Sequence, residues 1–484
     1  MTTLIKNTYI VDGSGKPPFK ADVLIHNGKI SAIGNFPTYK AHETVEGMSA
    51  YLAPGFIDIN ANADHYLTLF SDPSQKDLLF EGVTTIIGGQ CGASLAPLLY
   101  GSLESIKEWA GIGKTNVGWR TIKEFFEILN KLKFGVNFGT LVGHRTIRQA
   151  LTGDSKKDLS ANELKVFSLI LNRSLKEGAF GFSTGLGYVY AKQTSYNEIE
   201  SLVEIVAKNK SLYATHLRDE KRNLLQSISE TISVAKETGA KVLISHFRPF
   251  SGYGKDYEEA IGLINKNSDK ADICFDISPF GASGVLISEL LPEWIKEGNM
   301  ETILKDIETP GLRGKILREL PRLKAEETII LNAPGNEYFI GKSLKQFSES
   351  KDLKMSEGLL ELMKVTAMRA VVLHSNISQK KAEAAVKNDR AIIASNNMPK
   401  TFTKLLEMAE KRKVLSIESA IYKITGLPAQ RLGLKDRGLI KEGFIADLVL
   451  FKDARIREVI VSGKRIIKNG IFQNILEGKI LKHV

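Results

Sequence analysis

The chain has 484 residues, 43% of them hydrophobic, a formal net charge of +11 and only two cysteines. This length predicts a large central unit with a smaller one beside it, and two cysteines exclude a disulfide framework. No apolar run is long enough to span a bilayer, the first residues lack a secretion-signal pattern, and the lysines are interleaved with acidic residues. We therefore expect a cytoplasmic protein that binds neither membrane nor nucleic acid.

Both ends of the chain are typical of short β-strands. Residues 1–53 contain the apolar runs LIKNTYIVDG and ADVLIHNGKISAIG, and Asn27-Gly28 inside the second is a strong hairpin signal. The stretch 416–484 begins with a predicted helix and then returns to strands in ADLVLFKD and EVIVSGKRIIKNG, broken at Ser462-Gly463. The two ends together predict one small β-sandwich-like domain, because an isolated hairpin is marginal in water.

The middle of the chain, residues 54–415, alternates short apolar runs with longer amphipathic stretches. Eight of these runs predict strands: GFIDINAN, TTIIGGQC, FGTLVGH, AFGFSTG, SLYATHLR, KVLISHF, DICFDIS and AIIASNN. This pattern favours an α/β fold, a (β/α)8 TIM barrel. The run TIILNAP lies between the seventh and eighth strands, so residues from about 281 to 390 are predicted to be an insertion with helices and one extra strand.

Nearly every predicted barrel strand ends in a polar or reactive residue. These residues are Asn62, Cys91, His144, Thr184, His216, His246, Asp276 and Asn396. Because the carboxyl ends of barrel strands form the active-site face, we expect a site at this mouth of the barrel.

Three of these strand-end residues suit a metal ion. Singly, Cys91 is more readily interpreted as a small buried hydrophobe, and His216 and His246 as hydrogen-bonded structural histidines. Together, one thiolate and two imidazoles predict a three-ligand zinc site with an open fourth position. A single Zn2+ ion is the expected cofactor.

The other polar residues are weaker candidates. Asn60, Asn62 and Asn396 carry neutral carboxamides, which zinc does not prefer and which cannot shuttle a proton. Asp64 is open to two interpretations, a structural residue or a group that contacts a ligand and partly replaces a missing acid. Asp58 lies deeper in its strand and favours a structural role.

The whole pattern resembles the amidohydrolase superfamily, and within it the N-acyl-D-amino-acid deacylases (D-aminoacylases). The motifs that carry the resemblance are PGFIDINANADHY, GVTTIIGGQCGASLAP, YATHLRDE, LISHFR and LPAQRLGLKDRGLIKEGFIADLVLF. The resemblance implies that Cys91, His216 and His246 are metal ligands. It also implies that Tyr188 and Arg248 contact an amide-bearing or anionic substrate.

Departures from the family motifs fall on residues that carry chemistry. Asn60 and Asn62 stand where the family has a histidine pair, and Asn396 stands where it has the aspartate that serves as catalytic acid and base. The family segment that binds the substrate carboxylate after the eighth strand is also missing. The resemblance therefore implies a mononuclear zinc site and weak or altered activity.

Two functions remain open from the sequence. The first is a metal-dependent hydrolase of amide C–N bonds that acts on a small molecule such as an N-acylated amino acid, with Asn60, Asn62 and Asp64 beside Tyr188 and Arg248 in substrate binding. The second is a non-catalytic zinc- or ligand-binding pseudoenzyme with a regulatory role. The sequence indicates neither the individual substrate nor an oligomeric state.

Overall fold

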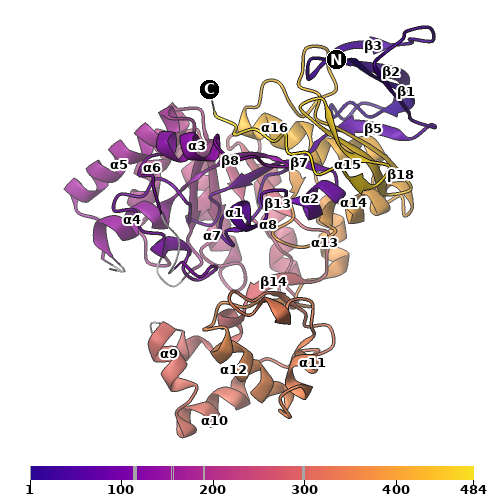
Figure 1. The fold of residues 1–484 in the computed structure, drawn as a ribbon. Coiled ribbons are helices and arrows are strands. Elements are labelled where there is room, and N and C mark those ends of the chain that lie inside the picture. Colours follow the sequence, from indigo (N-terminus) through magenta and orange to yellow (C-terminus); the bar gives the residue numbers. More distant parts are fainter. Residues whose placement is uncertain are drawn as a thin grey trace.

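The computed structural model describes residues 2–112, 117–153, 155, 157–188, 191–296 and 300–483. Its centre is a barrel of parallel strands, with a β-rich unit at one end and a helical lobe at the other (Figure 1). In chain order the barrel strands are β6 (Phe56–Asp58), β7 (Val83–Gly88), β8 (Asn137–Thr140) continued by β9 (Val142–Gly143), β10 (Gly181–Gly185), β11 (Leu212–His216), β12 (Lys241–Ile244), β13 (Ile273–Ile277) and β17 (Ala391–Ile393). They lie within the eight apolar runs or extend one residue beyond them, which confirms the expected barrel.

The barrel closes through two strand ladders and one seam. Parallel pairing joins β6–β7–β8 and, separately, β9–β10–β11–β12–β13–β17, and only Leu141 separates β8 from β9. Across the seam between β17 and β6, the amide of Asn396 donates to the carbonyl of Asn60 at 3.2 Å. The amide of Ser395 donates to Asp58 Oδ1 at 3.1 Å. Polar groups at the barrel mouth thus complete the ring.

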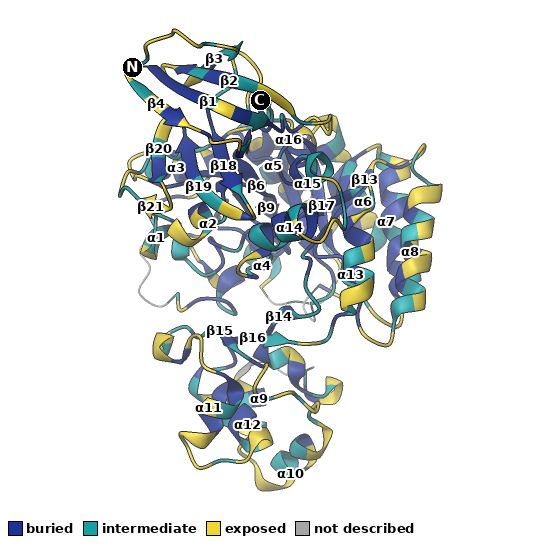
Figure 2. Ribbon diagram, turned by 90° about the vertical axis from the view of Figure 1, so that its right-hand side faces the viewer, coloured by how far each residue is buried: buried dark blue, intermediate teal, exposed yellow. Residues whose placement is uncertain are grey.

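Amphipathic helices cover the outside of the barrel. They include α2 (Lys76–Phe80), α3 (Ile122–Leu129), α4 (His144–Thr152), α5 (Ala161–Lys176), α6 (Tyr196–Lys208), α7 (Leu224–Thr238), α8 (Gly254–Lys266), α13 (Gln379–Val386), α14 (Thr401–Glu410), α15 (Ile417–Ile424) and α16 (Gly426–Leu432). Figure 2 shows exposed residues on the outward faces of α7, α8 and α13. Ser160 and Glu163 form a capping box that fixes the start of α5, because the amide of each residue donates to the side chain of the other.

Both ends of the chain share one sheet, as the sequence predicts. The sheet contains β1 (Thr2–Ile10), β2 (Phe19–His26), β3 (Lys29–Gly34), β4 (Glu43–Glu46), β5 (Tyr51–Pro54), β18 (Leu448–Lys452), β19 (Arg455–Val461), β20 (Lys464–Lys468) and β21 (Ile471–Phe472). β5 pairs with β1 on one side and with β18 on the other, so it joins the two ends of the chain. Asn27 and Gly28 have φ values of 49° and 79°, the left-handed conformation that a two-residue hairpin turn requires.

The segment between β13 and β17 forms a lobe with its own core. It contains an antiparallel sheet of β14 (Ser283–Leu286), β16 (Val371–His374) and β15 (Ile330–Asn332), with helices α9 (Met300–Asp306), α10 (Pro310–Glu319), α11 (Leu344–Glu349) and α12 (Met355–Val365). β15 is the strand expected in TIILNAP, but the lobe has two further strands, β14 and β16, where the sequence predicted one extra strand in all. Helix α13, inside the predicted range 281–390, packs on β13 and β17 of the barrel rather than in the lobe. In the part of the chain that the structure describes, no helix is both long and apolar enough to cross a membrane.

Candidate metal centre and active site

Cys91, His216 and His246 meet at the carboxyl ends of β7, β11 and β12. One ligand atom from each side chain lies within 4.8 Å of the others, and all three residues are buried. Cys91 Sγ is 3.4 Å from His246 Nε2. His216 Nδ1 is buried and has no hydrogen-bond partner, a costly state for a polar atom in an enclosed site. A thiolate, two imidazoles and an unpaired ring nitrogen fit zinc, which takes three protein ligands in open sites.

Glu220, four residues after His216, orients the cluster. Its carboxylate lies 3.2 Å from His246 Nδ1 and 3.5 Å from His216 Nε2, and accepts a 2.7 Å bond from Arg248 Nη2. Since Glu220 binds Nδ1 of His246, the other ring nitrogen of that histidine faces Cys91. Carboxylates that hold the second nitrogen of a metal-binding histidine in this way fix the ring and raise its basicity.

The two histidines titrate in opposite directions. Burial, together with His246, lowers the pKa of His216 to about 3, so His216 is neutral at pH 7 and its nitrogen lone pair is free. Burial and Arg248 would also lower the pKa of His246, but Glu220 and Cys91 outweigh them and raise it to about 10. Without a metal ion, His246 is therefore protonated at pH 7 and carries a positive charge.

The backbone at the site is held in an uncommon conformation. Cys91, His246 and Asn396 have φ values of 52°, 40° and 45°, in the left-handed region that non-glycine residues seldom adopt. Such residues cost free energy and persist only where surrounding contacts fix them, which is frequent at functional sites. Gly187 supports the same region by close approach, because a Cβ there would lie 2.6 Å from His216 Nε2.

Two of the three asparagines bind Asp276 at the end of β13. Asn60 Nδ2 donates to Asp276 Oδ2 at 3.0 Å, and Asn396 Nδ2 donates to Asp276 Oδ1 at 2.8 Å. The amide of His246 adds a third bond at 2.9 Å to Oδ1. Asp276 is fully buried, and burial raises its pKa although these donors favour the anion. The carboxamides thus act as donors to a carboxylate and brace β6, β13 and β17.

The remaining predicted substrate residues divide into two groups. Tyr188, Arg248, Asn62 and Asn396 line a cavity of about 80 Å³ together with the cluster. Asn60 and Asp64 do not line it: Asn60 is bound to Asp276, and Asp64 is buried and accepts a 2.6 Å bond from the amide of Gly89. Asp64 thereby supports the turn that carries Cys91.

Three of the eight polar strand ends lie outside the cavity: Asp276, which the two asparagines bind, and His144 and Thr184. His144 Nε2 is 2.7 Å from Glu198, which also binds Arg148, so His144 belongs to a buried ion-pair network behind the strands. Thr184 bonds to Tyr213 and Thr215 inside the barrel wall. Strand position alone placed both residues at the mouth, but their side chains are satisfied elsewhere.

The cavity contains residues that the motifs did not single out. Its walls include Tyr66, Trp109, Met398, Leu286, Val371 and Glu289, and the last three come from the lobe between β13 and β17. His65 also lines the cavity and stacks on Trp109 at 4.9 Å between ring centroids. Glu220 had a signal in the sequence, its spacing of four from His216, whereas Trp109 and Glu289 had none.

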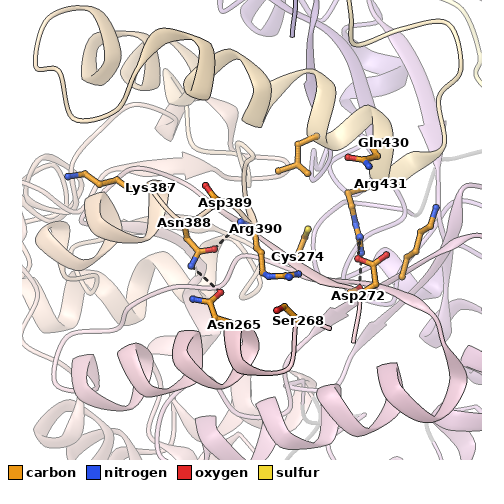
Figure 3. Close-up of a pocket in the computed structure, with 12 residues that line it drawn as sticks. Asn265, Ser268, Asp272, Cys274, Lys387, Asn388, Asp389, Arg390, Gln430 and Arg431 are labelled. Carbon is orange, nitrogen blue, oxygen red and sulfur yellow. Dashed lines mark hydrogen bonds and ion pairs between the residues drawn. The ribbon is translucent and has the colours of Figure 1, made fainter. Parts of the chain in front are cut away.

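A larger cavity of about 580 Å³ lies at the opposite end of the strands (Figure 3). Lys241, Asp272 and Arg390 line it near the amino ends of β12, β13 and β17, and Arg431 of α16 reaches into it and pairs with Asp272. The second cysteine, Cys274, also lies there, and burial raises the pKa of its thiol. In barrels of this type the amino-terminal face serves stability rather than catalysis, so the smaller cavity is the candidate active site.

Comparisons with known proteins support the same family. Residues 386–467 match the model of the amidohydrolase family. An N-acyl-D-aspartate deacylase from Alcaligenes xylosoxydans xylosoxydans is 26% identical over 470 residues, which cover 94% of this chain and 86% of that protein.

Two solved structures share the fold over 99% of both chains, each with a TM-score of 0.81. One is an N-acyl-D-glutamate deacylase from Bordetella bronchiseptica, 21% identical, complexed with zinc and a phosphonate inhibitor. The other, 22% identical, is a D-aminoacylase described as having a binuclear metal centre. Motifs, fold and the matched C-terminal region agree: the chain carries an amidohydrolase-family match in residues 386–467 and is similar to D-aminoacylases along nearly its whole length.

Proposed function

We propose that this protein is a zinc-dependent hydrolase of amide C–N bonds, with N-acylated amino acids as its substrate class. The observation that carries the proposal is the buried cluster of Cys91, His216 and His246 at the catalytic face of the barrel. The names of the relatives, deacylases of N-acyl-D-aspartate and N-acyl-D-glutamate, support the substrate class. When bound there, zinc would supply a Lewis acid for the amide carbonyl.

The residues around the cluster would position the substrate. Arg248 lies against Glu220 and lines the cavity, and Tyr188 packs edge-on against His216 with ring centroids 4.8 Å apart. The aromatic side chains of Tyr66 and Trp109 line the same cavity and would exclude water from an acyl group. A cavity of about 80 Å³ is small beside the roughly 300–1,000 Å³ of ordinary ligand pockets, which favours a short acyl chain.

We propose one zinc ion and weakened activity. The second metal position and the acid/base are replaced by Asn60, Asn62 and Asn396, and two of these amides already donate to Asp276. A carboxamide cannot accept the proton that hydrolysis moves, and loss of a general acid/base typically costs about 10²- to 10⁴-fold in rate. The same contacts favour the alternative, a pseudoenzyme that binds zinc or a ligand without turnover.

The test is a metal analysis beside a hydrolysis assay on a panel of N-acetyl-D-amino acids and their L-enantiomers. One equivalent of zinc with slow turnover, both lost in Cys91→Ala, would support the hydrolase. One equivalent of zinc with no turnover on any substrate would support the pseudoenzyme. If the protein contained no zinc and showed no turnover, both versions of the zinc site would be refuted.

A further inference from the structure

Glu289 places an uncommitted carboxylate at the edge of the cavity. It belongs to the short 3-10 helix η2 (Ile287–Leu290), which follows β14 in the lobe, and it lines the cavity while remaining exposed. Among the described residues its carboxylate oxygens have no hydrogen-bond or ion-pair partner within bonding distance. Partial burial of this side chain at the cavity edge raises its pKa, Arg248 opposes the shift, and Glu220 adds to it.

The cations near Glu289 contact other groups, although Arg248 Nε is buried and has no hydrogen-bond partner. Arg248, the one lysine or arginine among the described residues that line the cavity, donates to Glu220 at 2.7 Å. Lys296 binds Glu293 and the main-chain carbonyl of Glu289, and Lys221 lies 5.0 Å from the ring centre of Phe250. Glu289 is the one Asp or Glu among the described residues that line the cavity, so the acidic charge at its edge comes from this side chain.

The cavity that this carboxylate lines also has aromatic walls. Trp109 and Tyr188 meet edge to face at 5.9 Å between ring centroids, and Tyr66 lines the same cavity. The face of an aromatic ring attracts a cation, and a carboxylate next to such rings adds direct Coulomb attraction. Aromatic walls with one acid at the edge are suited to an ammonium or guanidinium group.

We propose that the site selects an N-acyl compound that carries a positive charge, with the acyl group at the Cys91–His216–His246 cluster and the cation against Glu289. This substrate class rests on the proposed function, but the charge preference does not require turnover. It differs from the anionic side chains named in the substrates of the relatives, N-acyl-D-aspartate and N-acyl-D-glutamate. Glu289 would then be a specificity-determining residue supplied by the lobe.

The test is calorimetric binding of three ligands to the zinc-loaded full chain at low ionic strength. N-acetyl-D-lysine, N-acetyl-D-norleucine and N-acetyl-D-glutamate share the acyl group and the α-carboxylate; the first two have the same four-carbon side chain with and without an ammonium, and the third has a carboxylate on a shorter side chain. We expect N-acetyl-D-lysine to bind about three- to thirtyfold more tightly than N-acetyl-D-norleucine, and N-acetyl-D-glutamate to bind most weakly. Addition of 0.5 M salt should reduce the difference, because a partly exposed ion pair is screened.

Two variants and one control assign the preference to this carboxylate. Glu289→Gln should bring the lysine and norleucine ligands to equal affinity, and Glu289→Lys should favour the glutamate ligand. Glu293→Gln is the matched control, since Glu293 lies four residues away, is 87% exposed in its side chain and does not line the cavity. Its preference should match that of the wild type.

Equal binding of all three ligands, binding of none, or a preference that survives Glu289→Gln would overturn the inference. Hydrolysis assays on the same ligands separate it from the proposed function. Selective binding without turnover would leave the charge preference standing while the hydrolase fails. Turnover without a charge preference would support the hydrolase and refute the proposed role of Glu289.

Discussion

Replacement of Glu220 by Gln tests whether the histidine pair is built to hold a metal. Among the residues that the structure describes, Glu220 is the one carboxylate that contacts both His216 and His246, and it also binds Arg248. Glutamine keeps the size of the side chain but removes the charge that orients both rings. Loss of such a supporting carboxylate typically weakens metal binding by about 10- to 100-fold, or about 1.4–2.7 kcal/mol.

A competing effect has the opposite sign. Glu220 also stabilises the proton on His246, whose pKa it helps to raise, so its removal makes that proton easier to displace. A dication gains about twice as much Coulomb energy from the carboxylate as a proton does, so the net result is weaker zinc binding.

The assay is competition with a chromophoric chelator at fixed pH, with Glu230→Gln as the control. Glu230 forms a similar ion pair with Arg218 nearby in the chain, with side chains 21–23% exposed, but touches neither histidine of the cluster. We expect the control to keep wild-type zinc affinity and to lose at most about 1 kcal/mol of unfolding free energy. Unchanged zinc affinity in Glu220→Gln would refute the supporting role, and equal losses in both variants would show that the effect is not local.

Three further predictions concern single side chains. Cys91→Ala should abolish stoichiometric zinc binding, whereas Cys274→Ala at the other end of the barrel should keep it; metal analysis by mass spectrometry decides, and retention of zinc in Cys91→Ala would exclude the proposed ligand set. Asn396→Asp should raise the rate of hydrolysis by up to about 10²- to 10⁴-fold. The same variant should lower the melting temperature of the metal-free protein, because the new carboxylate replaces an amide donor 2.8 Å from Asp276. An unchanged melting temperature would contradict this contact. Burial raises the pKa of Asp58 from 3.8 to about 6, so between these pH values the folded protein holds a proton that the unfolded chain releases. The free energy of unfolding should therefore fall by about 3 kcal/mol from about pH 4 to pH 6. Denaturant titrations should show a smaller pH dependence in Asp58→Asn, and the same pH dependence in both proteins would argue against the shift.

Much of the architecture was predictable from local patterns. Apolar runs of strand length separated by amphipathic stretches predict the barrel, because parallel strands are buried on both faces and covering helices on one. The turns at Asn27-Gly28 and Ser462-Gly463 were also predictable, since φ values near +49° and +79° suit these residues and few others. The three metal-site candidates followed from residue type and from their position at strand ends.

The tertiary structure decided which polar residues face the cavity and what they contact. His144 and Thr184 end strands as His216 does, yet their side chains are satisfied behind and within the barrel wall. Asn60 and Asn396 lie more than 300 residues apart in the chain, and only closure of the ring brings both to Asp276. Glu289 reaches the cavity because the lobe folds back over the barrel mouth. The period of a strand and the residue type specify which face of the strand a side chain lies on. Its hydrogen-bond partner depends on contacts between segments distant in the chain, and no local pattern encodes these contacts.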